Sequence, residues 1–372
     1  MKYALYTYTT ENIGDDIQSI AARRFLPTVD YRIDRDLVGL WNNPEPTEKV
    51  KLITNGWYMH KPYAWPIKDK SLNPLYISLY VEQEDNRVVK AFLTDESRRK
   101  LNAHGKVGAR DAATKKFFES HGIEAYLSGC VTLTLQKDEN IKKHDFILLT
   151  DVSEKIYNYI KKNTDKKIVY LSNVVSTKQN TEVRDELAEL YLYLYQSATC
   201  VITERLHTAL PSLALETPVV LIRKDNPIGG NDYRLRGLGE LAYYLTEDEF
   251  LEGKVFDINK PKANKPDYKK YRQSLIITCS DFTGYNNQQS FSRSEIGYKS
   301  FDEVLDRVYF LSQMNLKQLS IETSLNRYKL NQMSDLEHVV EDQKIELNKL
   351  MGVKFTVRRL TGNIKRRILN GK

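Results

Sequence analysis

The sequence predicts an α/β protein of two Rossmann-like domains that face a cleft, followed by a C-terminal helical extension. Strand and helix patterns alternate along the chain, which is typical of parallel sheets joined by right-handed crossovers. A polar linker, QKDENIKKHD, divides this alternation into two series. The chain has 372 residues, of which 41% are hydrophobic, enough for two packed domains. The predicted segments are the domains 1–140 and 141–318, a helical extension 319–350 and a basic tail 351–372.

The first series begins with a strand pattern, KYALYTY. A turn, NIGDD, leads into a helix in which Ile17 and Ile20 recur at helical spacing. We expect Asp15 or Asp16 to cap this helix by accepting hydrogen bonds from its free amides. A second helix is predicted over DAATKKFFESHG and ends at Gly122. Further strands are predicted at KVKLITNGW, LYISLYV, KVGA, EAYLSG and CVTLTL.

The second series repeats the alternation of strands and helices. Strands are predicted at DFILLTD, KKIVYLSN, ATCVIT and TPVVLIRKD. Helices are predicted at SEKIYNYIKKN, TEVRDELAELYLYLYQSA, ERLHTALPSLALE and FDEVLDRVYFLSQ. Between 319 and 350, apolar residues such as Met333, Leu336 and Val340 follow 3–4 spacing, which predicts another helix. In such folds ligands bind at the carboxyl ends of the parallel strands, so we expect the site in the cleft between the domains.

The number and spacing of the cysteines and histidines argue against a disulfide-linked fold and against a metal-binding fold. Cys130, Cys200 and Cys279 lie far apart, and the sequence contains no CxxC. The six histidines are scattered, with no HExxH. The sequence therefore signals neither a disulfide framework nor a metal site. The polar start of the chain does not resemble a signal peptide, and no apolar run of about 18 residues occurs, so we expect a cytoplasmic protein.

The net charge of +7 is concentrated at the carboxyl terminus. Residues 351–372 hold seven basic residues and no acidic one, so the rest of the chain is balanced. This balance argues against nucleic-acid binding by the body of the protein. Five apolar residues of the tail fall on one helical stripe of about 80°: Val353, Val357, Leu360, Ile364 and Ile368. We expect a basic amphipathic helix that binds an anionic membrane surface; the alternatives are a disordered tail and a nucleic-acid-binding tail.

The segment ITERLHTAL carries the strongest functional signal. A predicted strand ends at Thr203 and a helix opens near Arg205. Arg205 and His207 point apart in a regular helix, so they can meet one ligand only at a strand-to-helix turn. The free amides of such a turn favour an anion. The alternative is a salt bridge for Arg205 and a half-buried structural role for His207.

The segment GARDAAT places Arg110 and Asp111 at another strand-to-helix turn. Asp111 is expected to cap the helix. Arg110 is either a surface arginine or, together with Arg205, one of two cations supplied by the two domains.

The segment ENIGDD forms the first strand-to-helix turn and contains Asn12, Gly14, Asp15 and Asp16. Gly14 allows a tight turn or the close approach of a ligand. Because the segment is not GxGxxG, it does not predict a dinucleotide site.

Three weaker motifs complete the candidates. Trp57 follows a predicted strand, where it either stacks on a sugar or is buried. Asp34 and Asp36 form a DxD spelling that could hold a metal with a nucleotide sugar. Asp232 and Arg234 lie in a glycine-flanked loop from which they could reach the cleft.

The segments NIGDDIQ, VGARDAAT, LSGCVTLTL and TERLHTALPSLALETPVVLI occur in an order that resembles the polysaccharide pyruvyltransferase family. The resemblance covers roughly residues 3–245. It implies two Rossmann-like domains similar to the glycosyltransferase-B architecture, phosphoenolpyruvate as the donor and no cofactor or metal. It also implies that Arg110, Arg205 and His207 bind the donor. After about residue 245 the resemblance is weak.

The residue types suit this chemistry. Arginines hold the carboxylate and phosphate of phosphoenolpyruvate. Forming a ketal requires protonation of the donor's methylene carbon, for which His207 is the candidate acid, and Asp15 or Asp16 is the candidate base for the sugar hydroxyl. The acceptor is expected to be a sugar of a polysaccharide or of a lipid-linked glycan. Two other classes stay open: a nucleotide-sugar glycosyltransferase of the same shape, and a non-catalytic carbohydrate-binding protein.

Overall fold

The structure, a computed structural model, describes residues 1–58, 61–223, 237–288, 298 and 300–327. Residues 1–315 form one compact unit, which contains both sheets. Leu316–Lys372 form a second unit, of which residues 316–327 are described and are helical.

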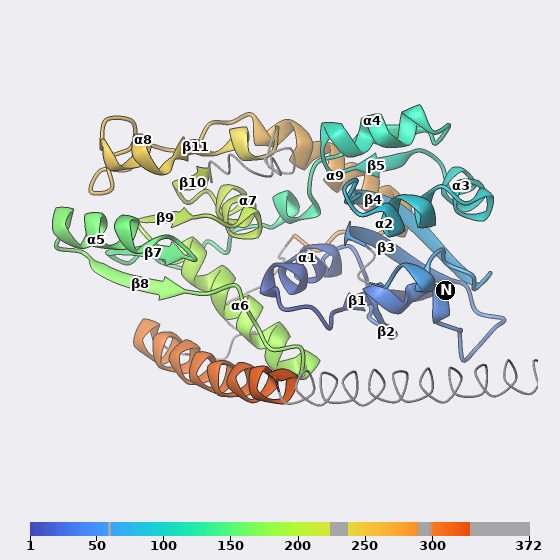
Figure 1. Cartoon of the computed structure of the whole chain (residues 1–372), viewed down its shortest axis with the longest axis horizontal. Coiled ribbons are helices and arrows are strands. Elements are labelled where there is room, and N and C mark those ends of the chain that lie inside the picture. Colours follow the sequence, from blue (N-terminus) through green and yellow to red (C-terminus); the bar gives the residue numbers. More distant parts are fainter. Residues whose placement is uncertain (59–60, 224–236, 289–297, 299, 328–372) are drawn as a thin grey trace, which may run out of the picture. The chain divides into compact units, whose positions relative to one another are not determined.

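The first sheet is parallel throughout and has the strand order β2-β1-β3-β4-β5-β6 (Figure 1). Its strands are β1 (Lys2–Thr7), β2 (Tyr31–Asp34), β3 (Val50–Trp57), β4 (Leu72–Tyr80), β5 (Val107–Ala109) and β6 (Ala125–Leu127). The strand order reverses between β1 and β3, which lie side by side with Lys2 opposite Val50. Ligands of such sheets bind at this switch point, beyond the carboxyl ends of the strands.

The second sheet is also parallel, with the order β11-β10-β9-β7-β8. Its strands are β7 (Phe146–Thr150), β8 (Lys167–Leu171), β9 (Cys200–Thr203), β10 (Val219–Arg223) and β11 (Tyr243–Thr246). The order reverses between β7 and β9, with Ile147 opposite Cys200. The prediction of two Rossmann-like halves is therefore confirmed.

Helices connect the strands in both halves. The first half contains α1 (Ile13–Arg23), α2 (Asn86–Phe92), α3 (Asp95–Asn102), α4 (Ala112–Ser120) and the short 3-10 helices η1 (Arg35–Leu40), η2 (Pro62–Ala64) and η3 (Val131–Thr134). The second half contains α5 (Glu154–Asn163), α6 (Thr181–Ser197), α7 (Leu206–Ala214), η5 (Gly239–Leu241), α8 (Glu247–Leu251) and α9 (Tyr268–Thr283). Residues 301–315 are also helical, as predicted for FDEVLDRVYFLSQ.

Two local predictions need correction. The cap of α1 is Asn12, because the helix begins at Ile13 and both Asp15 and Asp16 already lie in its first turn. The segment CVTLTL forms η3 instead of a strand. Its apolar residues are buried in the core shared by both halves, so an apolar run indicated burial but not strand geometry. The cap at Asp111 is confirmed, since its side chain accepts a hydrogen bond from the amide of Thr114 at 2.8 Å.

Helix α1 lies between the two sheets and packs against both α6 and α7 (Figure 1). Its residues Ile13–Ala22 are all buried. One hydrophobic core joins Leu5 and Ile53 of the first sheet to Leu148 and Val201 of the second. The two halves therefore meet over a continuous packed core.

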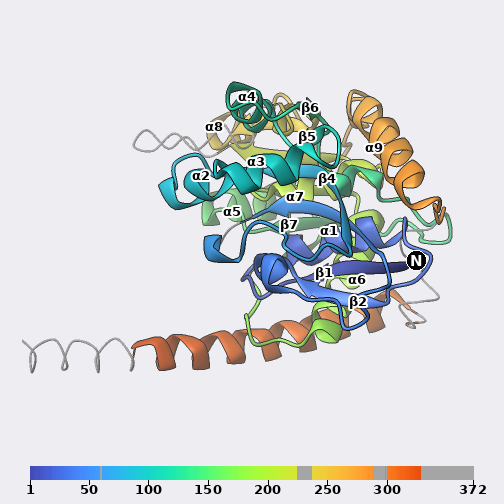
Figure 2. The same ribbon diagram turned by 90° about the vertical axis from the view of Figure 1, so that its right-hand side faces the viewer.

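After the second sheet the chain returns to the first half. The end of α9 lies beside the first sheet (Figure 2), where the side chain of Lys51 donates to the carbonyl of Phe282 at 2.5 Å. Farther on, the side chain of Arg24 donates to the carbonyl of Asn287 at 3.1 Å.

The C-terminal predictions fall largely outside the described residues. The predicted helix 319–350 is helical as far as residue 327. The basic tail 351–372 lies outside the described part of the chain. Within the described part, every helix is too short or too polar to cross a membrane.

Candidate active site

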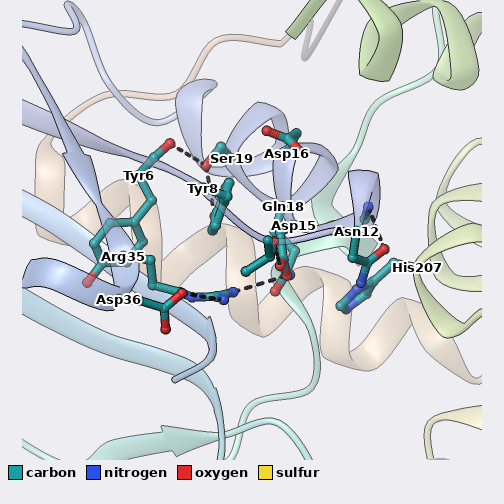
Figure 3. Close-up of polar contacts among 12 residues, drawn as sticks. Tyr6, Tyr8, Asn12, Asp15, Asp16, Gln18, Ser19, Arg35, Asp36 and His207 are labelled. Atoms are coloured by element: carbon teal, nitrogen blue, oxygen red, sulfur yellow. Dashed lines mark hydrogen bonds and ion pairs between the residues drawn. The ribbon is translucent and has the colours of Figure 1, made fainter. Parts of the chain in front are cut away.

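The amino terminus of α1 touches His207 of the second half (Figure 3). Asn12 caps this helix by accepting a hydrogen bond from the amide of Gly14 at 3.0 Å. A Cβ atom on Gly14 would lie only 2.5 Å from the Cβ of His207, so the absence of a side chain permits this approach. The amide of Ile13 also donates to the carbonyl of Asn173 in the second half, at 2.9 Å. Gly14 was predicted to allow a tight turn or the close approach of a ligand, and the group that approaches it in the structure is the side chain of His207.

The surroundings of His207 disfavour its charged form. Its Nε2 lies 3.9 Å from the Sγ of buried Cys130. Burial, followed by the positive charges of Arg110 and Arg35, lowers the pKa of His207 to about 4, while Asp15 opposes this shift. At neutral pH the imidazole is therefore uncharged.

This lowered pKa predicts a pH dependence of stability. An unfolded chain binds a proton at His207 near pH 6.5, whereas the folded chain binds it only near pH 4. Between these values the unfolded state holds more protons, so the contribution of His207 to stability falls as the pH drops from 6.5 to 4. We expect His207→Ala to flatten this part of the stability curve, measured by urea unfolding at several pH values. An unchanged slope would contradict the burial of a neutral His207.

Asp15 is held by three side chains (Figure 3). Thr10 donates to its Oδ2 at 2.7 Å, Gln18 donates to its Oδ1 at 3.1 Å, and Nη1 of Arg35 lies 3.1 Å from the same Oδ1. Burial raises the pKa of Asp15, but Arg35 and the hydrogen bond from Thr10 outweigh it, so the net shift is downward. Asp15 is therefore a fixed carboxylate beside His207.

Arg35 is a member of this site that the sequence analysis missed. It is 1% exposed, pairs with Asp36 at 3.1 Å and lies over the ring of Tyr8 at 4.9 Å. The signal that could have identified Arg35 is its position at the end of a strand. Arg35 directly follows β2, just as Arg110 directly follows β5.

Arg110 is buried at the carboxyl end of β5. Its guanidinium lies 4.2 Å from the ring centroid of Tyr80, and its Nε lies 3.9 Å from Asp111. Among the residues that the structure describes, this buried Nε has no hydrogen-bond partner. Trp57 packs edge-on against the same Tyr80 at 5.7 Å and is half-buried. Arg110 is thus an interior cation close enough to shift the pKa of His207, and not a surface arginine.

Arg205 lies at the switch point of the second sheet. Its Nε donates to Asp151 Oδ2 at 2.7 Å, and its side chain is 46% exposed. Asp151 follows β7 with a φ of +48°, in the left-handed region that Asp adopts more readily than most non-glycine residues. Arg205 thus makes the salt bridge considered as an alternative, with a partner from a neighbouring strand. The residue of this segment that lies against Gly14 of α1 is His207.

Asp16 points away from this cluster. It forms a bidentate ion pair with Arg184 of α6, at 3.0 and 2.7 Å, and both residues are 2% exposed. Arg184 also donates to the carbonyl of Thr10 at 2.9 Å. We therefore assign Asp16, which was predicted to bind substrate, to the ion pair that links α1 to α6.

The remaining candidates take structural roles or lie outside the described residues. Asp34 caps η1 by accepting a hydrogen bond from the amide of Asp36, and Asp36 forms an ion pair with Arg35. Both aspartates of the DxD motif therefore have structural partners within the protein. Asp232 and Arg234 belong to a segment outside the described residues. The described part of the chain brings together no group of three potential metal ligands.

The polysaccharide pyruvyl transferase family matches residues 12–226, more than half of the chain. The chain therefore belongs to the polysaccharide pyruvyl transferase family, and it is a transferase that modifies a glycan. The match contains Asn12, Arg110, Arg205 and His207 and ends before Asp232. No curated protein sequence matches the chain significantly.

Similar solved structures include UDP-GlcNAc 2-epimerase from Methanocaldococcus jannaschii in complex with UDP-GlcNAc and UDP. It shares 14% identity, covering 83% of this chain and 100% of that chain, with a TM-score of 0.36. A second UDP-N-acetylglucosamine 2-epimerase shares 11% identity, covering 78% of this chain and 100% of that one, with a TM-score of 0.31. The wall teichoic acid polymerase TagF shares 11% identity, covering 86% of this chain and 90% of that one, with a TM-score of 0.33. Likeness at this level identifies neither an activity nor a ligand.

Proposed function

We propose that the protein transfers pyruvate from phosphoenolpyruvate to a sugar of a polysaccharide or lipid-linked glycan and forms a ketal. The observation that carries this proposal is the contact of His207 with Gly14 where the two halves join, within electrostatic reach of Asp15 and Arg110. This arrangement unites a titratable imidazole, a fixed carboxylate and a buried cation. Such a combination suits an anionic donor that must be protonated at carbon.

Donor binding would prepare His207 for this step. Phosphoenolpyruvate carries a carboxylate and a phosphate, which we assign to Arg110 from the first half and Arg205 from the second. Arg205 would exchange its partner Asp151 for the ligand, a change that its 46% side-chain exposure allows. The donor's negative charge would offset Arg110 and raise the pKa of His207, so that the imidazole takes up the proton it later donates.

The proposed reaction consumes two sugar hydroxyls and one donor. His207 protonates the methylene carbon, and the adjacent carbon becomes oxocarbenium-like. One hydroxyl attacks that carbon and gives its proton to Asp15. Asp15 is a weak base because of its lowered pKa, but the hydroxyl becomes acidic as its bond to carbon forms. The second hydroxyl then attacks the same carbon, and the bond between that carbon and the phosphate oxygen breaks. Inorganic phosphate leaves and takes the proton of the second hydroxyl.

The test is incubation of the full chain with phosphoenolpyruvate and a panel of glycans. We expect release of phosphate together with a product heavier than the acceptor by one pyruvate ketal, in the presence of a chelator as well as without it. Transfer from a nucleotide sugar instead would support the glycosyltransferase alternative. Glycan binding without any turnover would support the carbohydrate-binding alternative.

We expect Arg110→Ala to weaken donor binding more than it slows the chemical step. Arg110 is assigned to an anionic end of the donor, which carries its charge in the ground state and in the transition state alike. The donor KM should rise by roughly tenfold or more, with a smaller fall in kcat. Titration of the donor in steady-state assays measures both, and an unchanged donor KM contradicts the assignment.

Membrane association stays a prediction of the sequence. Deleting residues 351–372 should release the protein from anionic vesicles at low salt, because each basic residue near an anionic surface contributes about 1 kcal/mol. Transfer to a soluble acceptor should continue. Co-sedimentation with anionic and neutral vesicles tests this. Equal sedimentation of the full and shortened chains would show that the tail is not the anchor.

A further inference from the structure

Asn173 lies two residues after β8, at the place where the two halves meet, and it is 2% exposed. Its carbonyl accepts a hydrogen bond from the amide of Ile13, the first residue of α1, at 2.9 Å. The Nδ2 of its side chain donates to Oγ1 of Thr208, the residue that follows His207, at 3.2 Å. Asn173 therefore bonds to both of the helices that meet at His207.

The backbone amide of Asn173 makes a third contact with the site. It donates to Oδ2 of Asp151 at 3.0 Å, and the same oxygen accepts from Nε of Arg205 at 2.7 Å. Through the residues beside them, Asn173 is thus connected to Gly14, to His207 and to Arg205. Two of these connections use its backbone, and the one that leads to His207 uses its side chain.

The backbone around Asn173 also joins the two halves. Asn12 and Val174 form an antiparallel bridge, and the amide of Val175 donates to the carbonyl of Glu11 at 3.2 Å. A substitution at Asn173 leaves these backbone bonds in place. Its effect therefore reports what the side chain does.

The side-chain bond of Asn173 holds the first turn of α7. Thr208 is 0% exposed, and its hydroxyl also lies 3.2 Å from the hydroxyl of Tyr195, which is equally buried. Buried hydrogen bonds of this kind are strengthened by their low-dielectric surroundings and are costly to leave unmade. His207 belongs to the same turn and already lies close against Gly14, so a small displacement of α7 changes that contact.

We propose that Asn173 is a positioning residue, which holds His207 against the start of α1 in the geometry that proton transfer requires. Reacting groups must be held to within about 0.5 Å of their productive positions. A residue that bonds to both α1 and α7 therefore controls the rate without touching a substrate. The proposal rests on the role of His207 in the proposed function, and not on the identity of the donor.

The first measurement needs no substrate. NMR of protein isotope-labelled at histidine Cε1 follows the titration of His207, whose resonance is the one that His207→Ala lacks. In Asn173→Ala we expect the pKa of His207 to rise from about 4 by at least about one pH unit, because a loosened contact admits water to the imidazole. At pH 5 about half of the imidazoles would then carry a proton, instead of about a tenth. The charges of Asp15, Arg35 and Arg110 are unchanged in this variant.

The second measurement is turnover. Asn173→Ala should lower kcat by about 10- to 100-fold, because a displaced catalytic group reacts slowly. The donor KM should change by less than about threefold, because the backbone bond to Asp151 beside Arg205 remains. This division between kcat and KM separates lost positioning from lost binding.

The matched control is Asn43→Ala. Asn43 is also buried, and its Nδ2 donates to the hydroxyl of Ser71 at 3.0 Å, near the start of β3. This variant should lose stability but keep the titration of His207 and the kcat of the wild type. Circular dichroism checks that each variant is folded.

Two substitutions of Thr208 test the same bond from its other end. Thr208→Val keeps the shape of the side chain without the hydroxyl, so it should reproduce the changes in kcat and in the titration of His207. Thr208→Ser keeps the hydroxyl and should behave as the wild type does. This pair decides the question if Asn173→Ala does not fold.

Three results would overturn the proposal. One is a folded Asn173→Ala in which the pKa of His207 is unchanged. Another is an equal change of that pKa in Asn43→Ala, which would show a general effect of lost stability. The third is equal titration of His207 in the valine and serine variants of Thr208. Failure of the wild-type protein to use phosphoenolpyruvate would instead reject the donor, while the titration would still decide what holds His207.

Discussion

Replacing His207 by alanine should lower transfer by roughly 100- to 1000-fold while the protein stays folded. The ring of His207 reaches the amino terminus of α1 and lies close to both Arg110 and Asp15. Losing such a preorganised group costs about 2.7–4 kcal/mol of transition-state stabilisation. Release of phosphate at saturating donor and acceptor measures the effect.

The matched control for this variant is His104→Ala, because His104 is exposed and packs against Tyr76 in the first half. It should retain full turnover. Arg205→Ala should also abolish transfer if Arg205 exchanges Asp151 for the donor. Wild-type turnover in the His207 variant would remove that residue from the chemistry, whatever the donor is.

Replacing Arg184 by methionine should destabilise the protein by about 3–5 kcal/mol. The variant leaves Asp16 as a buried carboxylate without its cation, and breaking a buried pair in this way is costly. Burial already raises the pKa of Asp16 to about 6 with Arg184 present. Urea unfolding monitored by tyrosine and tryptophan fluorescence measures the loss.

The control for this prediction is a second ion pair between α1 and α6. Arg23 lies 2.6 Å from Glu189, but its side chain is 29% exposed. Arg23→Met should therefore cost no more than about 1 kcal/mol. The double variant Asp16→Leu with Arg184→Met should recover much of the loss, because it removes both charges together. Equal losses in the two single arginine variants would mean that burial does not set the strength of the Asp16 pair.

The fold could be predicted because the periodicity of apolar residues along the chain distinguishes strands from helices. Alternating apolar runs and amphipathic helices identified both parallel sheets. The error at Val131–Thr134 shows the limit of this signal, since a short buried run is apolar in a 3-10 helix as in a strand. The cap at Asn12 was missed because a few residues decide where a helix begins, and those residues are polar in either case.

The site was harder to predict because it depends on how two halves meet. The sequence indicated Arg110 and His207, which follow strand ends of different sheets. It did not indicate Arg35, because Arg35 lies between Asp34 and Asp36, and this DxD motif favoured the two aspartates as the candidate residues. Asp15 and Asp16 are neighbours in sequence, yet one faces Arg35 and the other faces Arg184. The direction of a side chain around a helix buried on all sides cannot be read from apolar spacing, since every face of that helix is covered.

The complete burial of α1 also bears on how the protein can be divided. A fragment that ended in the linker after the first sheet would expose Ile13, Ile17 and Ile20 to water, together with the unpaired carboxylate of Asp16. A fragment that began there would lose the helix that covers α6 and α7. Neither sheet is therefore a self-sufficient module, and a chimaera that exchanges one half must carry α1 and its contact residues on α6 as a matched set.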